Sequence, residues 1–72
     1  MSILRWLDDR QRRRSHLNRV LQRARDFGFP EADVAELRRT ALRLGRHYPH
    51  KSPGMHAEIE LFAMLEHRRR RA

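Results

Sequence analysis

The fold is decided by residues 17–30, which read LNRVLQRARDFGFP. The first part places apolar residues at the three- and four-residue spacing of one helix face: Leu17, Val20, Leu21, Ala24 and Phe27. Gly28 follows directly, and glycine commonly ends a helix because it adopts the left-handed conformation without strain. Pro30 then suits the first turn of a second helix. Residues 28–29 therefore predict a tight turn that makes the first two helices antiparallel neighbours.

On the N-terminal side, the helical positions that continue this apolar stripe are occupied partly by arginine. Traced backward, the stripe passes through Arg14, Arg10, Leu7 and Ile3. Arginine therefore interrupts it for about two turns. Two structures fit this pattern: a continuous helix whose start overhangs the core, or a short helix, a break near Asp8-Asp9 and a second helix. We favour one continuous helix over residues 2–27, capped by Ser2, because residues 8–16 contain no glycine or proline.

Beyond the turn, glycine and proline divide the chain into two further predicted helices, over residues 30–44 and 53–69. The former carries one apolar line along its length: Val34, Leu37, Ala41, Leu44 and Tyr48. Gly45 is expected to end this helix. In the latter, Ser52 suits the N-cap and Pro53 suits the first turn.

The third predicted helix is apolar around most of its circumference. One apolar stripe consists of Met55, Ile59 and Phe62. Four neighbouring apolar residues widen it: Leu61, Ala63, Met64 and Leu65. Such a helix is buried on more than one face, and two other helices can hardly cover it in a chain of 72 residues. We therefore expect a homodimer, with Leu61, Met64 and Leu65 buried at the self-association contact or in the core.

These elements predict an all-α fold in a single domain over residues 1–72. The expected architecture is a small three-helix bundle, a long helical hairpin plus a third helix, that self-associates. β-branched residues are few and never adjacent, which does not favour strands. Because the chain has no cysteine, neither a disulfide nor a zinc–thiolate site can stabilise it.

The charge of the chain is strongly positive and unevenly distributed. Lys and Arg number 17 against 9 Asp and Glu, a formal net charge of +8. Residues 1–28 hold eight arginines and three aspartates, a net charge of +5, and the rest of the chain carries +3. Arg12, Arg19 and Arg23 share an outer helix face, whereas Arg10 and Arg14 lie on the core-side line. An arginine-rich helix can follow a phosphate backbone and bind it by releasing counterions.

We therefore predict a non-enzymatic protein that binds nucleic acid, either DNA or RNA. The expected phosphate contacts are Arg10, Arg12, Arg13, Arg14, Arg19, Arg23, Arg68 and Arg69. The last two belong to a basic tail, residues 68–72, which is expected to fray from the C-terminal end of the third helix, where cations suit the helix dipole.

An acidic protein surface is the alternative partner for the same arginines. Trp6 lies off the line through Ile3 and Leu7, and Trp6 with Leu7 is expected to anchor a docking partner. In size and style, the short, arginine-rich helical chain resembles accessory proteins of phages and other mobile elements. That resemblance implies a modulator or inhibitor of a host protein or nucleoprotein complex. A structural or assembly subunit is a third reading.

Several function classes are disfavoured. The sequence contains no nucleophile elbow, glycine-rich phosphate loop or zinc-protease motif. His47, His50 and His56 lack the spacing of metal ligands. Glu31 and Asp33 would repel phosphate at the start of a recognition helix, which disfavours a helix-turn-helix. No apolar run approaches the roughly 20 residues of a membrane span. With no export signal, we expect a cytoplasmic protein without enzyme activity, metal, cofactor or membrane partner.

Overall fold

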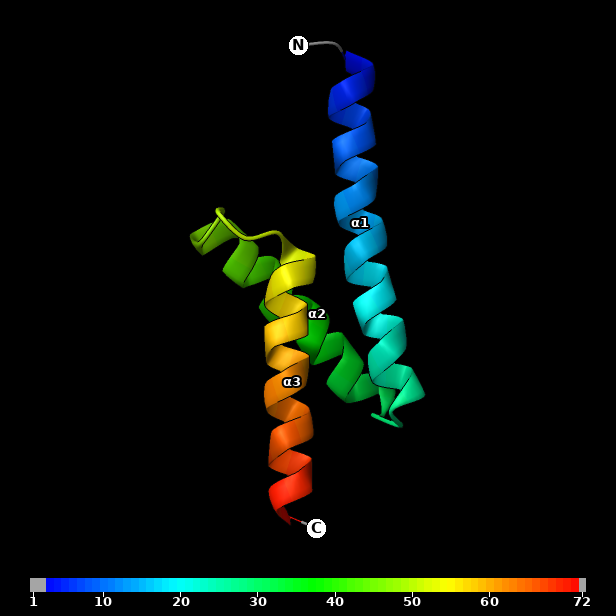
Figure 1. The fold of residues 1–72 in the computed structure, drawn as a ribbon, viewed down its shortest axis with the longest axis vertical. Coiled ribbons are helices and arrows are strands. Elements are labelled where there is room, and N and C mark those ends of the chain that lie inside the picture. The colour runs from blue at the N-terminus through cyan, green and yellow to red at the C-terminus, as the bar shows by residue number, and fades with distance from the viewer. Residues whose placement is uncertain (1–2, 72) are drawn as a thin grey trace.

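The computed structural model describes residues 3–71, which fold into three helices and no strand. The helices are α1 (Ile3–Asp26), α2 (Glu31–His47) and α3 (Pro53–Arg71), shown in Figure 1. The prediction of an all-α fold is confirmed. The proposed cap at Ser2 lies outside the described residues.

The turn after α1 forms as its sequence predicts. Gly28 has a φ of +90°, the left-handed conformation that glycine adopts without strain. The amide of Gly28 donates to the carbonyl of Arg25 at 2.8 Å, and the amide of Phe29 donates to the carbonyl of Ala24 at 3.2 Å. These two bonds together are a Schellman motif, which satisfies carbonyls that the helix end would otherwise leave unpaired.

Helix α2 runs past the glycine that was expected to end it. Gly45 is helical, the helix continues to His47, and the amide of Tyr48 donates to the carbonyl of Leu44 at 2.7 Å. A Cβ atom on Gly45 would lie 2.9 Å from Cγ of Pro53. The glycine therefore permits α2 and the start of α3 to approach closely, and the prediction that it terminates the helix is wrong.

Helix α3 begins where the sequence predicts and ends later. The amide of Met55 donates to Oγ of Ser52 at 3.3 Å, so Ser52 caps the helix that Pro53 begins. Its last turns include the arginines of the predicted tail, because residues 68–71 are helical. Only residue 72 of that tail lies outside the described part of the chain.

The core lies where the three helices meet. Its buried apolar residues are Leu17, Val20, Leu21, Ala24, Val34, Leu37, Ala41, Ala57 and Leu61. In Figure 1, α1 and α3 run in the same direction and α2 crosses obliquely behind α3. Although the tight turn joins α1 to α2, the two helices diverge from it, and α3 packs against both. Gly54 permits the contact of α3 with α1, because a Cβ atom there would lie 2.5 Å from the ring of His16.

The first half of α1 projects beyond this core. All residues from 3 to 15 are exposed, and the helix continues without a break into its buried half. The projection gives the molecule an elongated shape, 50 × 23 × 16 Å, as Figure 1 shows. The continuous, overhanging helix is therefore confirmed over the alternative with a break at Asp8-Asp9.

Candidate functional site

The arginines of α1 divide between two surfaces, and one of these is a cleft. Arg10, Arg13 and Arg14 line it from α1, and Arg46 lines it from α2. The cleft has a volume of about 470 Å³. Its remaining lining is mostly apolar: Leu17, Leu42, Gly45 and Pro53. We call this site the arginine cleft.

Two features of the helices place these four arginines around one cleft. Helix α1 continues without a break through Arg10, Arg13 and Arg14 as it leaves the core, and α2 continues past Gly45 to Arg46, so that arginines of both helices line the cleft. The guanidinium of Arg10 also lies over the ring of Trp6, 5.5 Å from its centroid. This cation–π contact favours one orientation of the Arg10 guanidinium.

The arginine cleft lacks internal compensation of its charge. Within residues 3–71, no carboxylate forms an ion pair with Arg10, Arg13, Arg14 or Arg46. Like charges held close together repel one another, and an anion between them removes that repulsion. The site is therefore electrostatically suited to an anionic ligand.

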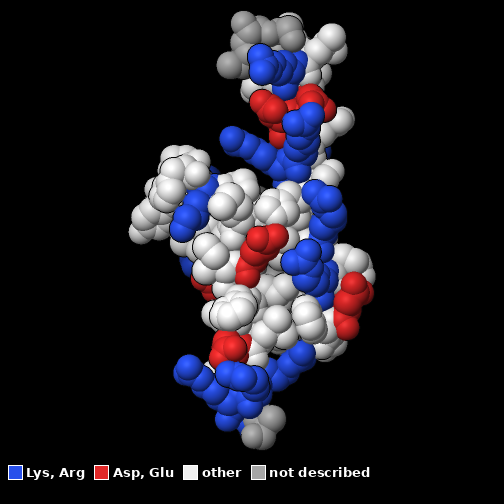
Figure 2. Space-filling view, in the orientation of Figure 1, with Lys and Arg blue, Asp and Glu red and all other residues white. Residues whose placement is uncertain are grey.

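The outer surface of α1 is flatter and carries acidic side chains beside its arginines. Arg12 pairs with Asp8 at 3.0 Å, and both side chains are well exposed. Arg19 lies beside them in a shallow depression, and Arg23 lies farther along at the rim of another groove. Figure 2 shows the basic side chains along α1 and a second basic group at the end of α3. Exposed pairs of this kind contribute little to stability and leave the arginine available to a stronger anion.

The two predicted tail arginines make contacts within the chain, far from the arginine cleft. Nη1 of Arg68 donates to the carbonyl of Phe27 at 2.8 Å, and its guanidinium lies 4.4 Å from the ring centroid of Phe29. Arg69 pairs with Glu66 at 3.2 Å. The sequence grouped both residues with the arginines of α1, but the contacts of Arg68 place it at the C-terminal end of α1, away from the arginine cleft.

Apolar side chains are exposed on the projecting half of α1. Trp6 and Leu7, the predicted docking residues, have exposed fractions of 52% and 43%. Ile3 and Leu4 are more exposed still. These residues adjoin the arginine cleft through the contact of Trp6 with Arg10.

The residues predicted for self-association lie in or against the core of the single chain. Leu61 is only 3% exposed, and Met64 and Leu65 are partly buried against the same core. The stripe of Met55, Ile59 and Phe62 faces solvent instead, with Phe62 67% exposed. Helix α3 is therefore apolar on two faces, of which α1 and α2 cover one.

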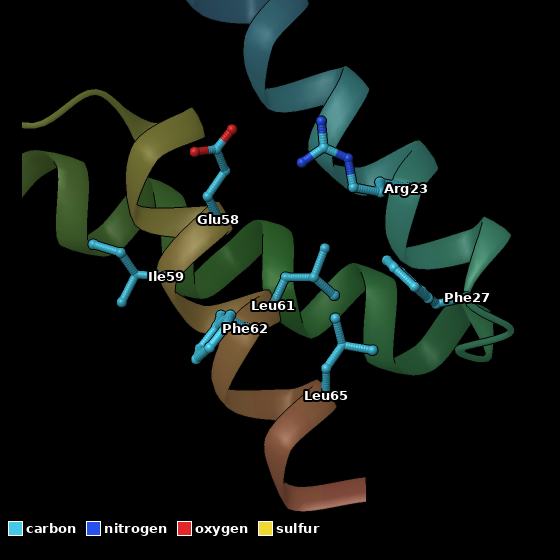
Figure 3. Close-up of a pocket in the computed structure, with 7 residues that line it drawn as sticks. All are labelled: Arg23, Phe27, Glu58, Ile59, Leu61, Phe62 and Leu65. Atoms are coloured by element: carbon cyan, nitrogen blue, oxygen red, sulfur yellow. The ribbon is translucent and has the colours of Figure 1, made fainter. Parts of the chain in front are cut away.

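The exposed face of α3 borders a second groove, of about 530 Å³, between α3 and α1. Figure 3 shows its lining, in which Arg23 and Glu58 lie at one end of an apolar surface. The apolar lining residues are Phe27, Ile59, Leu61, Phe62 and Leu65. Phe27 was expected to complete the apolar stripe of the first helix, but it follows the last helical residue and is half-exposed here.

The remaining polar contacts hold helices and loops in place. Nε of Arg25 donates to Oε1 of Glu31 at 2.6 Å across the turn. This hydrogen bond lowers the pKa of Glu31 and raises the pKa of Arg25. Nε2 of His16 lies 3.0 Å from Oε1 of Glu58, and the largely buried His56 donates from Nε2 to the carbonyl of Tyr48 at 3.1 Å.

Neither a metal centre nor a membrane span is found in the part of the chain that the structure describes. No three His, Cys, Asp or Glu side chains among residues 3–71 are grouped closely enough to hold a metal ion. None of the three helices combines the length and apolar character needed to cross a bilayer.

Arg46 is the cleft residue that sequence reasoning did not include. It follows the glycine that was expected to end the second helix, and no periodicity relates it to residues 10–14. Its position depends on how α1 and α2 cross, for which the sequence holds no local signal. Comparison with models of protein families, with curated proteins and with solved structures gives no match in any of the three cases, so function must be inferred from this geometry.

Proposed function

We propose that this protein is a non-enzymatic nucleic-acid-binding protein that contacts phosphates through the arginines of α1. The observation that carries the proposal is the projecting half of α1, in which every residue from 3 to 15 is exposed on a continuous helix. This segment adds nothing to the buried core, yet it holds the densest group of arginines: Arg10, Arg12, Arg13 and Arg14.

The dimensions of the projection suit a nucleic-acid backbone. Thirteen helical residues span about 20 Å at a rise of about 1.5 Å per residue. One strand of a duplex presents a phosphate about every 3.4 Å along its axis, so roughly six phosphates lie within that length. Arginine contacts of this kind position the protein on the backbone but carry little sequence preference.

The test is the salt dependence of binding to labelled duplex DNA and RNA, measured by fluorescence anisotropy. If four arginines neutralise phosphates, raising salt from about 50 to 200 mM should weaken binding on the order of 100-fold. The triple variant R12Q/R13Q/R14Q should lose most of this salt dependence. The control R38Q/R39Q/R43Q changes the net charge equally on α2 and should retain it. Equal losses in the two variants, or no binding at low salt, would contradict the proposal.

A second candidate function is the modulation of a host protein or nucleoprotein complex with an acidic surface. It is favoured by the exposed apolar side chains of Trp6 and Leu7 beside the arginines of α1. An aromatic anchor surrounded by arginine is typical of residues that dominate protein interfaces. A partner that stays bound after nuclease treatment, and is lost with W6A/L7A, would favour this function over nucleic-acid binding.

Self-association belongs to the main proposal, with the exposed face of α3 as the contact between two copies. It is supported by the solvent exposure of Ile59 and Phe62 on a helix whose other apolar face is already buried. Light scattering should report a dimer for the unmodified protein and a monomer for I59E. The control R38E should remain dimeric. A monomeric mass for the unmodified protein at micromolar concentration would contradict this part of the proposal.

A further inference from the structure

We infer that the arginine cleft is a discrete binding site for the terminal phosphate of a nucleic-acid strand. This inference rests on the proposed function and goes beyond it, because it assigns a specific ligand group to the inner face of α1. Along the length of a strand the arginines of α1 would contact internal phosphates, and at its end the arginine cleft would hold the terminal phosphate.

The first reason is that arginines from two helices line one cleft and form no ion pair with a carboxylate among residues 3–71. Carboxylates pair with arginine at several positions: Asp8 with Arg12, Glu31 with Arg25, Glu36 with Arg39 and Glu66 with Arg69. At the cleft, Arg46 is brought to the cluster of residues 10–14 from a distant helix, and no carboxylate among residues 3–71 pairs with these arginines. Four arginines that line one cleft without a carboxylate partner give it a positive charge that attracts an anion.

The second reason concerns the charge of the ligand. A phosphate monoester carries about −1.5 to −2 at pH 7 and presents three terminal oxygens. An internal phosphodiester carries a single charge. The planar guanidinium group can donate two parallel hydrogen bonds to two oxygens of one phosphate. The three terminal oxygens of a monoester can therefore accept hydrogen bonds from several arginines at once. The arginine cleft therefore favours the end of a strand over its interior.

The third reason is the shape of the cleft and its floor. The cleft is open to solvent and has a volume of about 470 Å³. That is more space than a phosphate group alone requires. Leu42 and Pro53, which are partly exposed, provide an apolar surface on which the sugar and base of the terminal nucleotide can lie.

The direct test compares single-stranded oligonucleotides of one sequence that carry a 5′-phosphate, a 3′-phosphate or hydroxyl groups at both ends, with the label at the opposite end. We expect at least one phosphorylated strand to bind about 10-fold more tightly than the hydroxyl strand at the same salt concentration. R46Q should abolish this preference. The control R43Q removes the same charge from α2 outside the cleft and should preserve it. Circular dichroism should show that both variants remain folded, since both side chains are exposed.

Equal binding of all three strands would overturn the cleft site and leave backbone binding by α1 intact. If no strand binds, the proposed function fails, and inorganic phosphate tests the cleft separately. Phosphate at constant ionic strength should raise the melting temperature of the unmodified protein and not that of R46Q, because a ligand that binds only the folded state stabilises it. The same rise in both proteins, or in neither, would overturn the site. So would tight binding of polyglutamate together with no effect of phosphate, which would assign the cleft to an acidic protein.

Discussion

Replacing Arg68 should destabilise the fold, because the structure gives this arginine a role in holding the first turn. Its guanidinium donates to the carbonyl of Phe27 at 2.8 Å and lies over the ring of Phe29 at 4.4 Å. Arg68 thereby connects the last turns of α3 to the segment between α1 and α2. Both contacts are lost in R68A.

The magnitude follows from these two contacts. An intramolecular hydrogen bond contributes about 0.5–1.5 kcal/mol net, and an exposed cation–π pair contributes about 0.5–1 kcal/mol. Because Arg68 is exposed, we expect R68A to lower the free energy of unfolding by about 1–2 kcal/mol. For a domain of this size, about 1 kcal/mol corresponds to roughly 4–8 °C in melting temperature, so Tm should fall by about 5–15 °C.

Thermal and urea unfolding followed by circular dichroism measure this difference. R70A is the matched control, since it removes the same side chain from the same helix at a position with no contact to the turn. R68K keeps the charge but lacks the planar guanidinium, so its stability should fall between those of R68A and the unmodified protein. If R68A and R70A unfold within about 0.3 kcal/mol of each other, Arg68 does not hold the turn and this reasoning is refuted.

Three further changes test other parts of the fold. G54A should lower the free energy of unfolding, measured in urea, by about 2 kcal/mol or more, because its Cβ would lie 2.5 Å from the ring of His16. An unchanged urea midpoint would show that Gly54 does not approach His16 this closely. L61A should lower the free energy of unfolding by about 2–5 kcal/mol and I59A by less than about 1 kcal/mol, because only Leu61 is buried. Equal losses in the two variants would refute the assignment of Leu61 to the core and Ile59 to the surface. The lowered pKa of Glu31 means that its ionised form stabilises the fold at neutral pH and that this contribution is lost as pH falls through the lowered pKa. E31Q should therefore be less stable than the unmodified protein at neutral pH, with no difference at strongly acidic pH, and a difference that persists there would contradict the linkage.

Local signals predicted most of the fold correctly. The left-handed glycine at 28, the cap at Ser52 and the apolar stripe from Leu17 to Ala24 depend on neighbouring residues alone, and all three are confirmed. The absence of helix breakers from residues 8–16 correctly indicated one continuous first helix. The prediction failed at Gly45, because glycine serves close packing as well as helix termination, and a sequence does not distinguish these two uses.

The faces of α3 were predicted only in part. Apolar residues around most of its circumference correctly indicated more apolar surface than the other two helices cover. Which face would be covered was not predicted, since Ile59 and Leu61 are both apolar and lie within one turn. The crossing of α3 over α1 and α2 places Leu61 inside and leaves Ile59 exposed.

By itself, the sequence determined the number and type of the helices, the turn between the first two, and the concentration of positive charge on the first. These properties depend on spacing and residue type over a few turns of helix. Only the tertiary structure decided which arginines lie close to which parts of the fold. It turned Arg68 back onto the first turn and brought Arg46 to the arginines of α1, because both positions depend on the angles at which whole helices cross.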